Sequence, residues 1–269
     1  MNDDIPALVA DAKMTDTPDR LRVRLVEFHV VHHCNLTCQG CSHFSPSARK
    51  HIISLVELAE QFRRVAQRIE PEVVHLLGGE PLLHPELPSV LKLARSAFCD
   101  AVIKLVSNGV LIERRGTELA QALAINRVVI AISLYPGTTV NRDEIARTMT
   151  RAGATAEFWK QDTFIDFLDP IGDSDPRAAR AQCPMGDSLN VRDDRLYPCP
   201  VSAWSDFGGA PVVPTDGVCL TETSAKLAAV LDPERITSKC RYCRCSPKRR
   251  AHAMGSRRPL LLTEAKQHA

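Results

Sequence analysis

The sequence lacks the features that would place it in several specialised classes of protein. Lys and Arg number 34 against 32 Asp and Glu, so the formal net charge is +2 and no overall field attracts nucleic acid or an anionic membrane. No stretch approaches the roughly 18 apolar residues of a membrane span. The start, MNDDIPALVADAK, has neither the basic n-region nor the apolar core of a secretory signal, and we find no internal repeat or low-complexity tract. We therefore expect a globular protein of the cytoplasm without membrane contact.

Cysteine is the exception, with ten residues in a chain of 269. A reducing compartment disfavours a disulfide framework, so clustered cysteines are first interpreted as metal or cluster ligands. Eight of the ten fall into groups: Cys34, Cys38 and Cys41; Cys183 and Cys199; and Cys240, Cys243 and Cys245.

Short β-branched runs alternate with longer amphipathic stretches from residue 23 onward, which is typical of βα units. We expect strands at 23–31, 73–77, 101–106, 127–132 and 155–160, and helices from Ser54 to a stop at Pro71 and at 85–98, 117–124 and 141–151. A doubly wound sheet and a barrel both fit this order, and both bind ligands at the carboxyl ends of their strands. The polar and glycine-rich segments of the chain fall at such ends.

The first strand leads into Cys34-x3-Cys38-x2-Cys41. Three thiolates within a turn or two can hold three irons of a [4Fe-4S] cube and leave the fourth iron open to a bound molecule. A zinc site with His33 or His43 as fourth ligand is the alternative for this spacing.

Three motifs in this order resemble the radical S-adenosylmethionine (SAM) superfamily: HHCNLTCQGC, VHLLGGEPLLHPEL and KLVSNG. The resemblance covers residues 23–165 and implies an α/β fold, a partial (β/α)6 TIM-like barrel. It also implies that Cys34, Cys38 and Cys41 bind three irons while the amino and carboxylate groups of SAM chelate the fourth. In the superfamily, reduction then cleaves the sulfonium bond, and the resulting 5′-deoxyadenosyl radical abstracts hydrogen from a substrate. The cofactor carries out this chemistry, and the protein positions it and excludes water.

Residues at the strand ends suit contacts to SAM in that fold. A backbone without side chains at Gly78 and Gly79 can approach a cofactor closely, and Glu80 or an exposed carbonyl can receive its ammonium group. A simple turn at the glycines and ordinary capping by the serines are the alternatives. The predicted SAM contacts are Gly78, Gly79, Glu80, Pro81, Ser107, Asn108 and Ser133.

The chain departs from the superfamily pattern at Gly40, where many members place an aromatic residue near the adenine. Phe44 or His43 could fill that space from just beyond. The departure concerns the adenine contact and leaves the cluster ligands intact.

Composition changes after residue 165, where a polar, proline-bearing segment at 166–183 predicts a linker or surface loop. The region 166–250 resembles the small C-terminal cysteine-rich auxiliary-cluster domains of the superfamily, called SPASM when long and twitch when short. We expect a hairpin of 188–191 with 195–197 and a helix at 224–231. A region of this size buries too little apolar area to be stable alone, so we expect a metal centre to stabilise its fold. The resemblance predicts a second [4Fe-4S] cluster on Cys183, Cys199, Cys240 and Cys243, with a zinc knot as the alternative.

The remaining cysteines have less defined roles. Cys245 could replace Cys243 as a ligand, ligate nothing, or donate hydrogen to a product radical. Cys219 would be a ligand only if the auxiliary cluster used a different set of cysteines. Cys99 is interpreted as a small buried hydrophobe at a helix end. The basic run SPKRRAHAMGSRRP spans 246–259 and overlaps the basic tail, 251–269, and we expect it to be solvated or disordered. No aromatic residue is interleaved with its charges, so nucleic-acid binding is not favoured.

The sequence thus predicts an oxidoreductase or epimerase of the radical SAM type, supplied with electrons by a donor such as flavodoxin or ferredoxin. Residues 1–22 form a short leader, whereas peptide-modifying relatives commonly carry an N-terminal recognition domain, and twitch-bearing relatives include aminocyclitol and sugar dehydrogenases. We therefore expect a small polar, carbohydrate-like or other natural-product substrate that is dehydrogenated or epimerised. A peptide-modifying enzyme is the alternative enzyme, and a zinc-stapled binding module is the alternative without catalysis.

Overall fold

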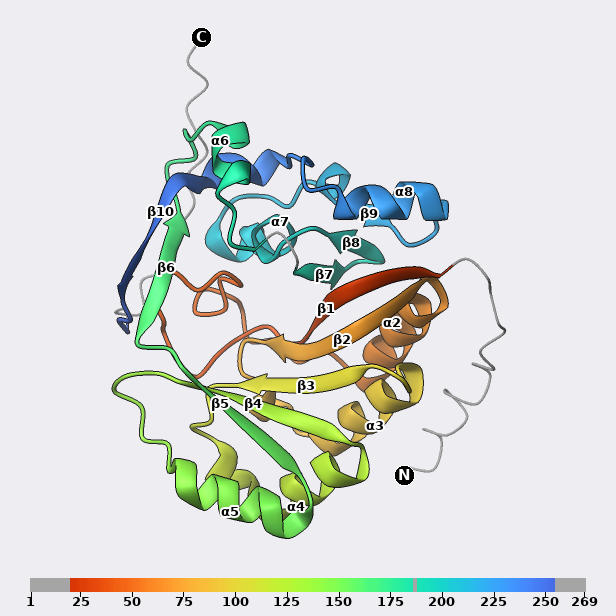
Figure 1. The fold of residues 1–269 in the computed structure, drawn as a ribbon, viewed down its shortest axis with the longest axis vertical. Helices are drawn as coiled ribbons and strands as arrows, with labels where there is room; N and C mark the ends of the chain where they lie inside the picture. The colour runs from red at the N-terminus through yellow and green to blue at the C-terminus, as the bar shows by residue number, and fades with distance from the viewer. Residues whose placement is uncertain (1–19, 186–187, 255–269) are drawn as a thin grey trace. The chain divides into compact units, whose positions relative to one another are not determined.

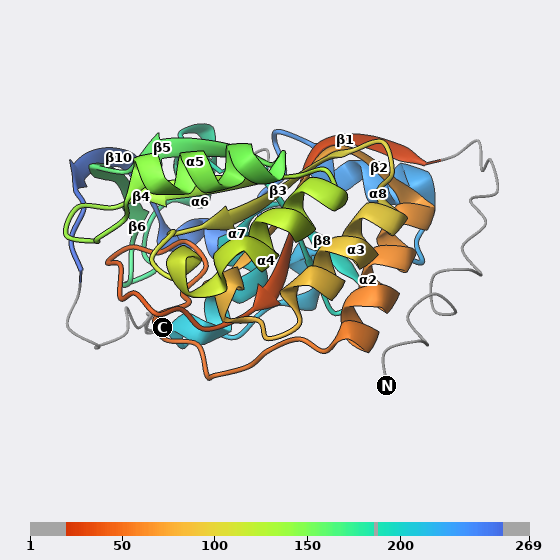
Figure 2. The ribbon, with the colours of Figure 1, turned by 90° about the horizontal axis from the view of Figure 1, so that it is seen from below.

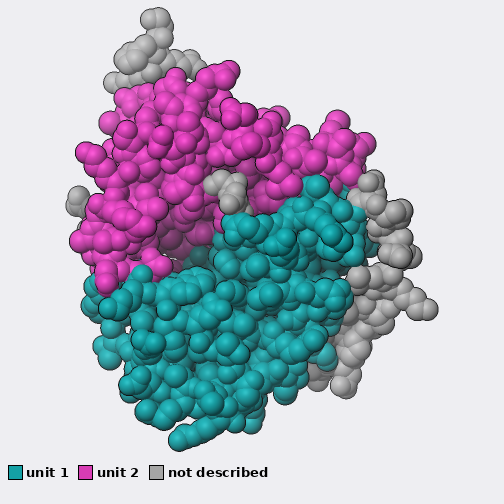
Figure 3. All heavy atoms as spheres, viewed as in Figure 1, with its two compact units in different colours: residues 1–31, 52–160 teal, residues 32–51, 161–269 magenta. Residues whose placement is uncertain are grey.

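The computed structural model describes residues 20–185 and 188–254. The chain divides into two compact units (Figure 3): unit 1 comprises residues 1–31 and 52–160, and unit 2 comprises residues 32–51 and 161–269. The predicted leader lies outside the described residues except for its last three positions.

Unit 1 is built on a parallel sheet of five strands (Figure 1). The strands are β1 (Leu21–Val31), β2 (Ile69–Gly78), β3 (Val102–Ser107), β4 (Val128–Leu134) and β5 (Thr155–Lys160), in the order β5-β4-β3-β2-β1. Every neighbouring pair is parallel, with Phe28 opposite Leu76 and Ser107 opposite Ile132. All five strands predicted from the sequence are confirmed, so their carboxyl ends share one edge of the sheet.

Four helices connect these strands: α2 (Leu55–Arg68), α3 (Leu87–Ala97), α4 (Ile112–Ile125) and α5 (Arg142–Ala152), with a short 3-10 turn η1 (Pro81–Leu83) after β2. Each helix packs against the next, and Figure 2 shows them along one side of the sheet. This is the arrangement that right-handed crossovers produce. Ser54 caps α2 in a capping box with Glu57, so that helix begins where the sequence predicts.

Two boundaries differ from the prediction. Pro71 does not end the first helix; α2 ends at Arg68, and Pro71 lies near the start of β2 opposite Val23, a position where a strand tolerates proline. The third helix begins at Ile112 rather than at Thr117, because two helical segments meet across a kink at Gly116, whose φ is 57°. Glycine interrupts the apolar periodicity there, which hid the first segment.

The core of unit 1 lies between the helices and the sheet. Phe28, Phe62 and Phe98 form a buried aromatic cluster, with ring centroids 4.9 Å apart for Phe28 and Phe62. A large shared apolar surface of this kind is the main source of stability for a sheet covered by helices.

Unit 2 contains short elements. They are β6 (Thr163–Leu168), α6 (Pro176–Ala181), β7 (Leu189–Arg192), β8 (Arg195–Tyr197), α7 (Pro200–Trp204), η2 (Ser205–Gly208), η3 (Pro214–Asp216), β9 (Val218–Cys219), α8 (Ser224–Ala228), η4 (Ala229–Leu231), η5 (Ser238–Tyr242) and β10 (Cys243–Ala251). The predicted hairpin is confirmed: β7 and β8 pair antiparallel around Asp193 and Asp194, whose φ angles of 48° and 58° make the tight turn. The helix expected at 224–231 is divided between α8 and η4.

Two expectations for this region hold only in part. The segment 166–183, expected to be a linker or surface loop, begins inside β6 and contains α6. Residues 246–251 of the basic run are ordered in strand β10, which pairs antiparallel with β6, although most of them are exposed as a solvated run would be. Asp166 of β6 lies 3.8 Å from Arg244 and 3.6 Å from Arg250, so opposite charges face each other across the pair. Residues 255–269 of the basic tail lie outside the described residues.

The core of unit 2 is a cluster of buried residues: Phe44, Phe167, Leu168, Tyr197, Val201, Ala203, Trp204, Ala210 and Tyr242. Phe44 comes from the segment 32–51, whereas the other members lie beyond residue 160. No helix of the part of the chain that the structure describes has the length and apolar character needed to cross a membrane.

We expect Gly78→Ala to destabilise unit 1 strongly. At Gly78 φ is 131°, and a Cβ there would lie 2.1 Å from the Val31 carbonyl oxygen, so both conformation and space exclude a side chain. Chemical denaturation should show a loss of more than about 3 kcal/mol or no folded protein. The control is Gly153→Ala, at a left-handed position with no atom within 4 Å, which should lose only about 1 kcal/mol. Equal losses in the two variants would refute the close approach at Gly78.

Candidate functional site

Glu80 holds together the strand ends of unit 1. Its Oε1 accepts hydrogen bonds from Ser107 Oγ at 2.7 Å and Leu82 N at 3.0 Å, and its Oε2 accepts one from Asn108 N at 2.9 Å. The side chain is only 1% exposed, and burial raises the pKa of Glu80 to about 7 despite these donors. The carboxylate expected to receive an ammonium group therefore ties the end of β2 to the end of β3.

The glycines before Glu80 also make contacts within unit 1. Gly78 gives β2 its close approach to Val31, and Gly79 N donates a hydrogen bond to the Val31 carbonyl at 2.8 Å. Pro81 is the buried first residue of η1, and Ser133 is buried near the end of β4. Ser107, Asn108 and Glu80 are thus brought together, as the shared sheet edge predicts.

Sequence reasoning missed two side chains that hold the segment after β2. Arg115 donates from Nη2 to the His84 carbonyl at 2.6 Å and from both Nε and Nη2 to the Leu82 carbonyl. The His84 Nε2 lies 2.9 Å from the Ile53 carbonyl oxygen. The sequence gives no periodic signal for Arg115, because it stands just before the kink at Gly116.

The loop 32–51, which we call the cluster loop, carries Cys34, Cys38 and Cys41 and belongs to unit 2. Leu36 N donates to Cys34 Sγ at 3.4 Å, and backbone amides of residues 43–45 donate to the Cys41 sulfur. Burial and the neighbouring Cys41 raise the pKa of Cys38 to about 12, and burial raises the pKa of Cys41. Bound iron would offset the cost of ionising these two thiols, because the positive charge of a metal deprotonates a thiol that coordinates it.

The start of the cluster loop is packed against aromatic rings of the same unit. The His32 ring lies 5.0 Å from His51, 5.3 Å from Trp204 and 5.1 Å from Phe207, measured between centroids. Burial, together with the charges of His51 and Arg192, lowers the pKa of His32 to about 4, so the ring is neutral near pH 7. A neutral imidazole two residues before Cys34 orients the loop by stacking.

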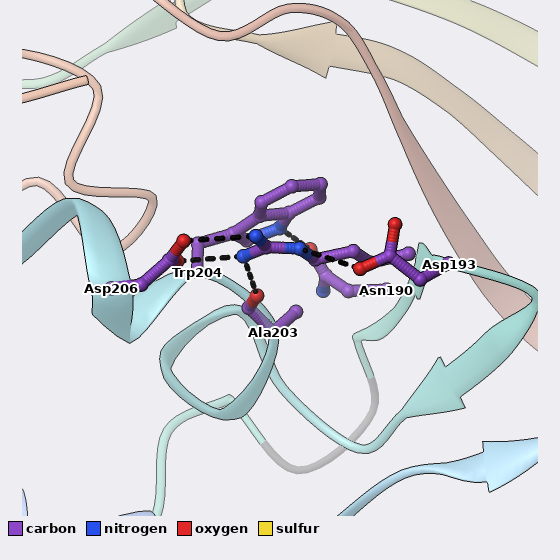
Figure 4. Close-up of polar contacts among 6 residues, drawn as sticks. Asn190, Asp193, Ala203, Trp204 and Asp206 are labelled. Carbon is purple, nitrogen blue, oxygen red and sulfur yellow. Dashed lines mark hydrogen bonds and ion pairs between the residues drawn. The ribbon is translucent and has the colours of Figure 1, made fainter. Parts of the chain in front are cut away.

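Arg192 fixes this aromatic group (Figure 4). Its guanidinium donates to both carboxylate oxygens of Asp206, at 2.6 and 2.8 Å, and to the Ala203 carbonyl at 2.7 Å, while it lies 5.0 Å from the Trp204 ring. The Trp204 Nε1 donates to Asn190 Oδ1 at 2.9 Å. Sequence reasoning missed this group, because its members join only when the hairpin β7–β8 folds onto α7.

The space beside Gly40 is taken by an arginine. A Cβ at Gly40, where φ is 77°, would lie 2.8 Å from Arg250 Nη2, and Arg250 Nη1 donates to Gln39 Oε1 at 3.3 Å. Phe44, expected as a substitute aromatic residue near the adenine, is 2% exposed and packs in the core of unit 2. Its ring therefore belongs to the hydrophobic core of unit 2, and its backbone adopts the left-handed conformation, with a φ of 53°, at a turn of the cluster loop.

Four cysteines of unit 2 line one cavity, which we call the cysteine cavity. They are Cys183, Cys199, Cys240 and Cys243, the predicted auxiliary ligands, joined by Ala179, Arg180, Pro198, Arg235, Thr237 and Lys239. Burial raises the pKa of Cys199 to about 11, and burial and the other three thiols raise the pKa of Cys243 still further. The four sulfurs are therefore close enough to repel one another when ionised.

The walls of the cysteine cavity fit a thiolate-bound cluster. Backbone amides of Met185, Ser202 and Thr237 donate at 3.4 Å to the sulfurs of Cys183, Cys199 and Cys240, as is common around iron–sulfur clusters. The Nε of Arg235 is buried without a hydrogen-bond partner. Among described residues, no group of three His, Cys, Asp or Glu side chains is placed to hold a single metal ion. A [4Fe-4S] cluster has a different requirement, because each cysteine binds a different iron and the four sulfurs are spaced around the whole cluster.

The other three cysteines lie outside this cavity. Cys245 points its sulfur at the Asp175 carbonyl, 3.6 Å away, and Cys219 lies 3.1 Å from Thr221 Oγ1, a hydrogen bond that lowers its pKa. Cys99 is exposed and bonds Asp100 Oδ2 at 3.2 Å, so its interpretation as a buried hydrophobe is wrong. Phe98 is buried directly after α3, and the chain turns to solvent at Cys99 and Asp100.

Comparison with known families matches residues 29–160 to the Radical SAM superfamily. Among curated proteins, GTP 3',8-cyclase of Sulfurovum sp. (strain NBC37-1) is 32% identical over 124 residues, 45% of this chain and 36% of that protein. GTP 3',8-cyclase of Chlorobaculum tepidum is 28% identical over 100 residues, 37% of this chain and 30% of that protein. The chain thus spans about a third of the length of these relatives.

Two solved structures share the fold. BtrN in complex with AdoMet and 2-DOIA superposes with a TM-score of 0.54 at 16% identity, covering 84% of this chain and 94% of BtrN. Native anSMEcpe with bound AdoMet gives a TM-score of 0.51 at 14% identity, covering 81% of this chain and 88% of that chain. The α/β fold with a mostly parallel sheet is therefore shared with both of these structures.

We expect the stability of unit 1 to fall as pH rises from about 4.5 to 7. The folded protein holds on Glu80 a proton that the unfolded chain releases, so rising pH favours unfolding by up to about 1.4 kcal/mol per pH unit. Urea denaturation across this range should show the decline, and Glu80→Gln should remove it. The control Glu113→Gln, at an exposed position of α4, should retain it. A Glu80→Gln profile that matches the unsubstituted protein would contradict the raised pKa.

Proposed function

From the radical SAM superfamily domain that residues 29–160 form, we propose that this protein is a radical SAM enzyme whose cluster loop holds a [4Fe-4S] cluster through Cys34, Cys38 and Cys41. The superfamily uses that cluster together with SAM. When bound, the pair supplies the electron and the 5′-deoxyadenosyl radical that start the reaction. The observation that carries the proposal is the family match together with three thiols in one loop directly after β1.

The residues of the cluster loop bind and orient in this proposal. Amides at Leu36 and at residues 43–45 donate to the sulfurs of Cys34 and Cys41, which stabilises the ionised ligands. His32, stacked on His51, lies before the three cysteines, and the buried Phe44 lies after them, so both ends of the segment that carries the ligands are fixed. Three ligands fixed in this way leave one iron corner for SAM.

We propose that the strand ends of unit 1 contact SAM through backbone and neutral polar groups. The proposed contacts remain Gly78, Gly79, Glu80, Pro81, Ser107, Asn108 and Ser133. Because three protein donors already occupy the Glu80 carboxylate, it acts mainly as a positioning residue for the backbone around it. The amide side chain of Asn108 and the hydroxyl of Ser133 are suited to the ribose and the carboxylate.

The cysteine cavity supports a second [4Fe-4S] cluster and, with it, an oxidative outcome. Removal of one hydrogen atom leaves a substrate radical, and loss of one further electron and one proton completes a dehydrogenation. A cluster in unit 2 can take that electron. We propose a small polar, carbohydrate-like substrate, as in twitch-bearing dehydrogenases of the superfamily; BtrN, which shares the fold, was solved with 2-DOIA. A ferredoxin or flavodoxin would supply the electron that starts each turnover.

Replacing Cys34, Cys38 and Cys41 by Ala should lower the iron content of anaerobically reconstituted protein from about eight to about four per chain. The same variant should lose reductive cleavage of SAM to 5′-deoxyadenosine, because no iron corner is left for the cofactor. The control is Cys99→Ala, which removes an exposed thiol and should change neither quantity. Colourless protein with stoichiometric zinc, or cleavage that persists in the triple variant, would refute the proposal.

Incubation with deuterated sugars and amino sugars should transfer deuterium into 5′-deoxyadenosine. Unlabelled substrate in deuterated buffer distinguishes the two outcomes: an oxidised product indicates dehydrogenation, and deuterium in a carbon-bound position of the product indicates epimerisation. Epimerisation with Cys245 as donor requires that Cys245→Ala abolish this label. Transfer from a labelled peptide, with none from sugars, would favour the peptide-modifying alternative.

A further inference from the structure

The face of the unit 1 sheet that lies opposite its helices carries charged side chains. Successive side chains of a strand alternate between faces, so the packing of Phe28 on Phe62 of α2 turns Glu27 to the other face. In β2, Leu76 lies opposite Phe28, which places its neighbour His75 on that other face as well. We call this side of the sheet the polar face, and its charged and aromatic residues include Glu27, His75, Lys104, Glu157 and Trp159.

Three of these side chains form a row across adjacent strands. Glu27 lies opposite His75 in the pairing of β1 with β2, and His75 lies opposite Lys104 in the pairing of β2 with β3. Neighbouring strands are about 4.8 Å apart, so each side chain of the row is within reach of the next. A carboxylate, an imidazole and an ammonium group therefore occupy successive positions of the polar face.

Such a row is unusual for a parallel sheet, because parallel strands generally carry apolar side chains on both faces. The helix side of this sheet follows the rule, since Leu76, Leu105 and Ile130 are completely buried there. Removing charged groups from water costs free energy, and departures from the apolar pattern are expected where a protein has its functional site. The polar face is thus a candidate for binding a polar ligand.

His75 has one ring nitrogen bonded and the other available. Its Nδ1 lies 3.3 Å from Glu27 Oε1, so the carboxylate can hold the imidazole with its proton on Nδ1. Nε2 has no hydrogen-bond partner among the residues that the structure describes. The His75 side chain is 16% exposed, whereas that of Glu27 is 8% exposed. An imidazole held in this way can accept a proton from a substrate through its second nitrogen.

The other charges on the polar face are balanced within it. Lys104 Nζ lies 2.7 Å from Glu157 Oε2, so the Glu157 carboxylate reduces the repulsion that Lys104 would exert on a protonated His75. His29 is the remaining titratable side chain that the described strands of unit 1 place on this face, and it is buried beside Gly78. The Glu27 carboxylate would stabilise the imidazolium that forms when His75 takes a proton.

His75 lies near the proposed SAM contacts. It stands three residues before Gly78, so about 10 Å of strand separates it from the sheet edge. Lys104 Nζ also lies 5.4 Å from the centre of the Trp159 ring. The polar face thus combines an aromatic ring with charged donors and acceptors, which suits a substrate that has both hydroxyl groups and apolar C–H surface.

We propose that the polar face binds a polyol substrate and that His75, oriented by Glu27, takes the hydroxyl proton when this substrate is dehydrogenated. The inference rests on the proposed function, which supplies the hydrogen abstraction and the second cluster. Abstraction leaves a radical on a carbon that carries a hydroxyl group. The O–H bond then breaks, its proton passes to His75 Nε2, and one electron passes to the second cluster as the C=O bond forms. His75 releases the proton to solvent, and a one-electron carrier of the ferredoxin type reoxidises the cluster.

The test measures hydrogen abstraction and product separately in the full-length reconstituted protein. The probes are C-deuterated glucose, glucosamine and myo-inositol, supplied with SAM and a reductant. His75→Gln should still transfer deuterium into 5′-deoxyadenosine, because abstraction precedes the proton transfer. The amount of oxidised product per labelled 5′-deoxyadenosine should fall at least about tenfold. Glu27→Gln disturbs only the orientation of His75 and should lower this ratio by a smaller factor.

The ratio separates a role in proton transfer from a structural role, because a misfolded site loses abstraction and product together. The matched control is Glu70→Gln: Glu70 of β2 pairs with Arg22 of β1 at 3.5 Å on the helix side of the same two strands, so the ratio should stay unchanged. If His75→Gln does not fold, Glu27→Gln provides the comparison with the same measurement.

Two kinds of failure are distinguishable. A ratio that is the same in the His75, Glu27 and Glu70 variants as in the unsubstituted protein would overturn the role of His75 and leave the proposed function intact. If the unsubstituted protein transfers deuterium from none of the three probes, or transfers it without forming oxidised product, the proposed substrate class or oxidative outcome is wrong, and the role of His75 is overturned with it.

Discussion

The constraint from which unit 2 is best understood is the free-energy cost of ionising thiols that are buried beside one another. Cys183, Cys199, Cys240 and Cys243 line one cavity, and burial raises the pKa values of Cys199 and Cys243. Such a group of thiols is costly to ionise without cations at its centre. Backbone amides donate to three of the four sulfurs, which fits thiolate ligands of an iron cluster.

The same unit also supports the cluster loop. Phe44 packs among the core residues of unit 2, and the His32 ring makes tilted contacts with Trp204 and Phe207, beside the ion pair of Arg192 and Asp206. In unit 1, Glu80 joins the ends of β2 and β3 by a buried network. Both groups use polar or aromatic side chains to fix backbone, which is what a site of defined geometry needs.

Much of the fold could be predicted because its signals are local. The five strands of unit 1 and the capping box at Ser54 follow from periodicity and adjacent residues, and Cys34, Cys38 and Cys41 stand within eight positions of one another. Strand β10 could not be recognised, since a basic run gains strand character only from its pairing with β6 and Asp166. The sequence did not indicate that Arg235 and Lys239 line the cysteine cavity, because they reach it only when η5 and the segment before it fold beside the cysteines. The direction of the Glu80 carboxylate also depended on tertiary contacts, which no motif records.

The central claim is that the chain carries two four-iron clusters and that only one of them has an iron open to SAM. Mössbauer spectroscopy of protein reconstituted with 57Fe, with and without SAM, tests it most directly. The account predicts about eight irons per chain, of which one changes its isomer shift when SAM is added. A spectrum that SAM leaves unchanged, or one that shows every iron held by four sulfurs, would contradict it.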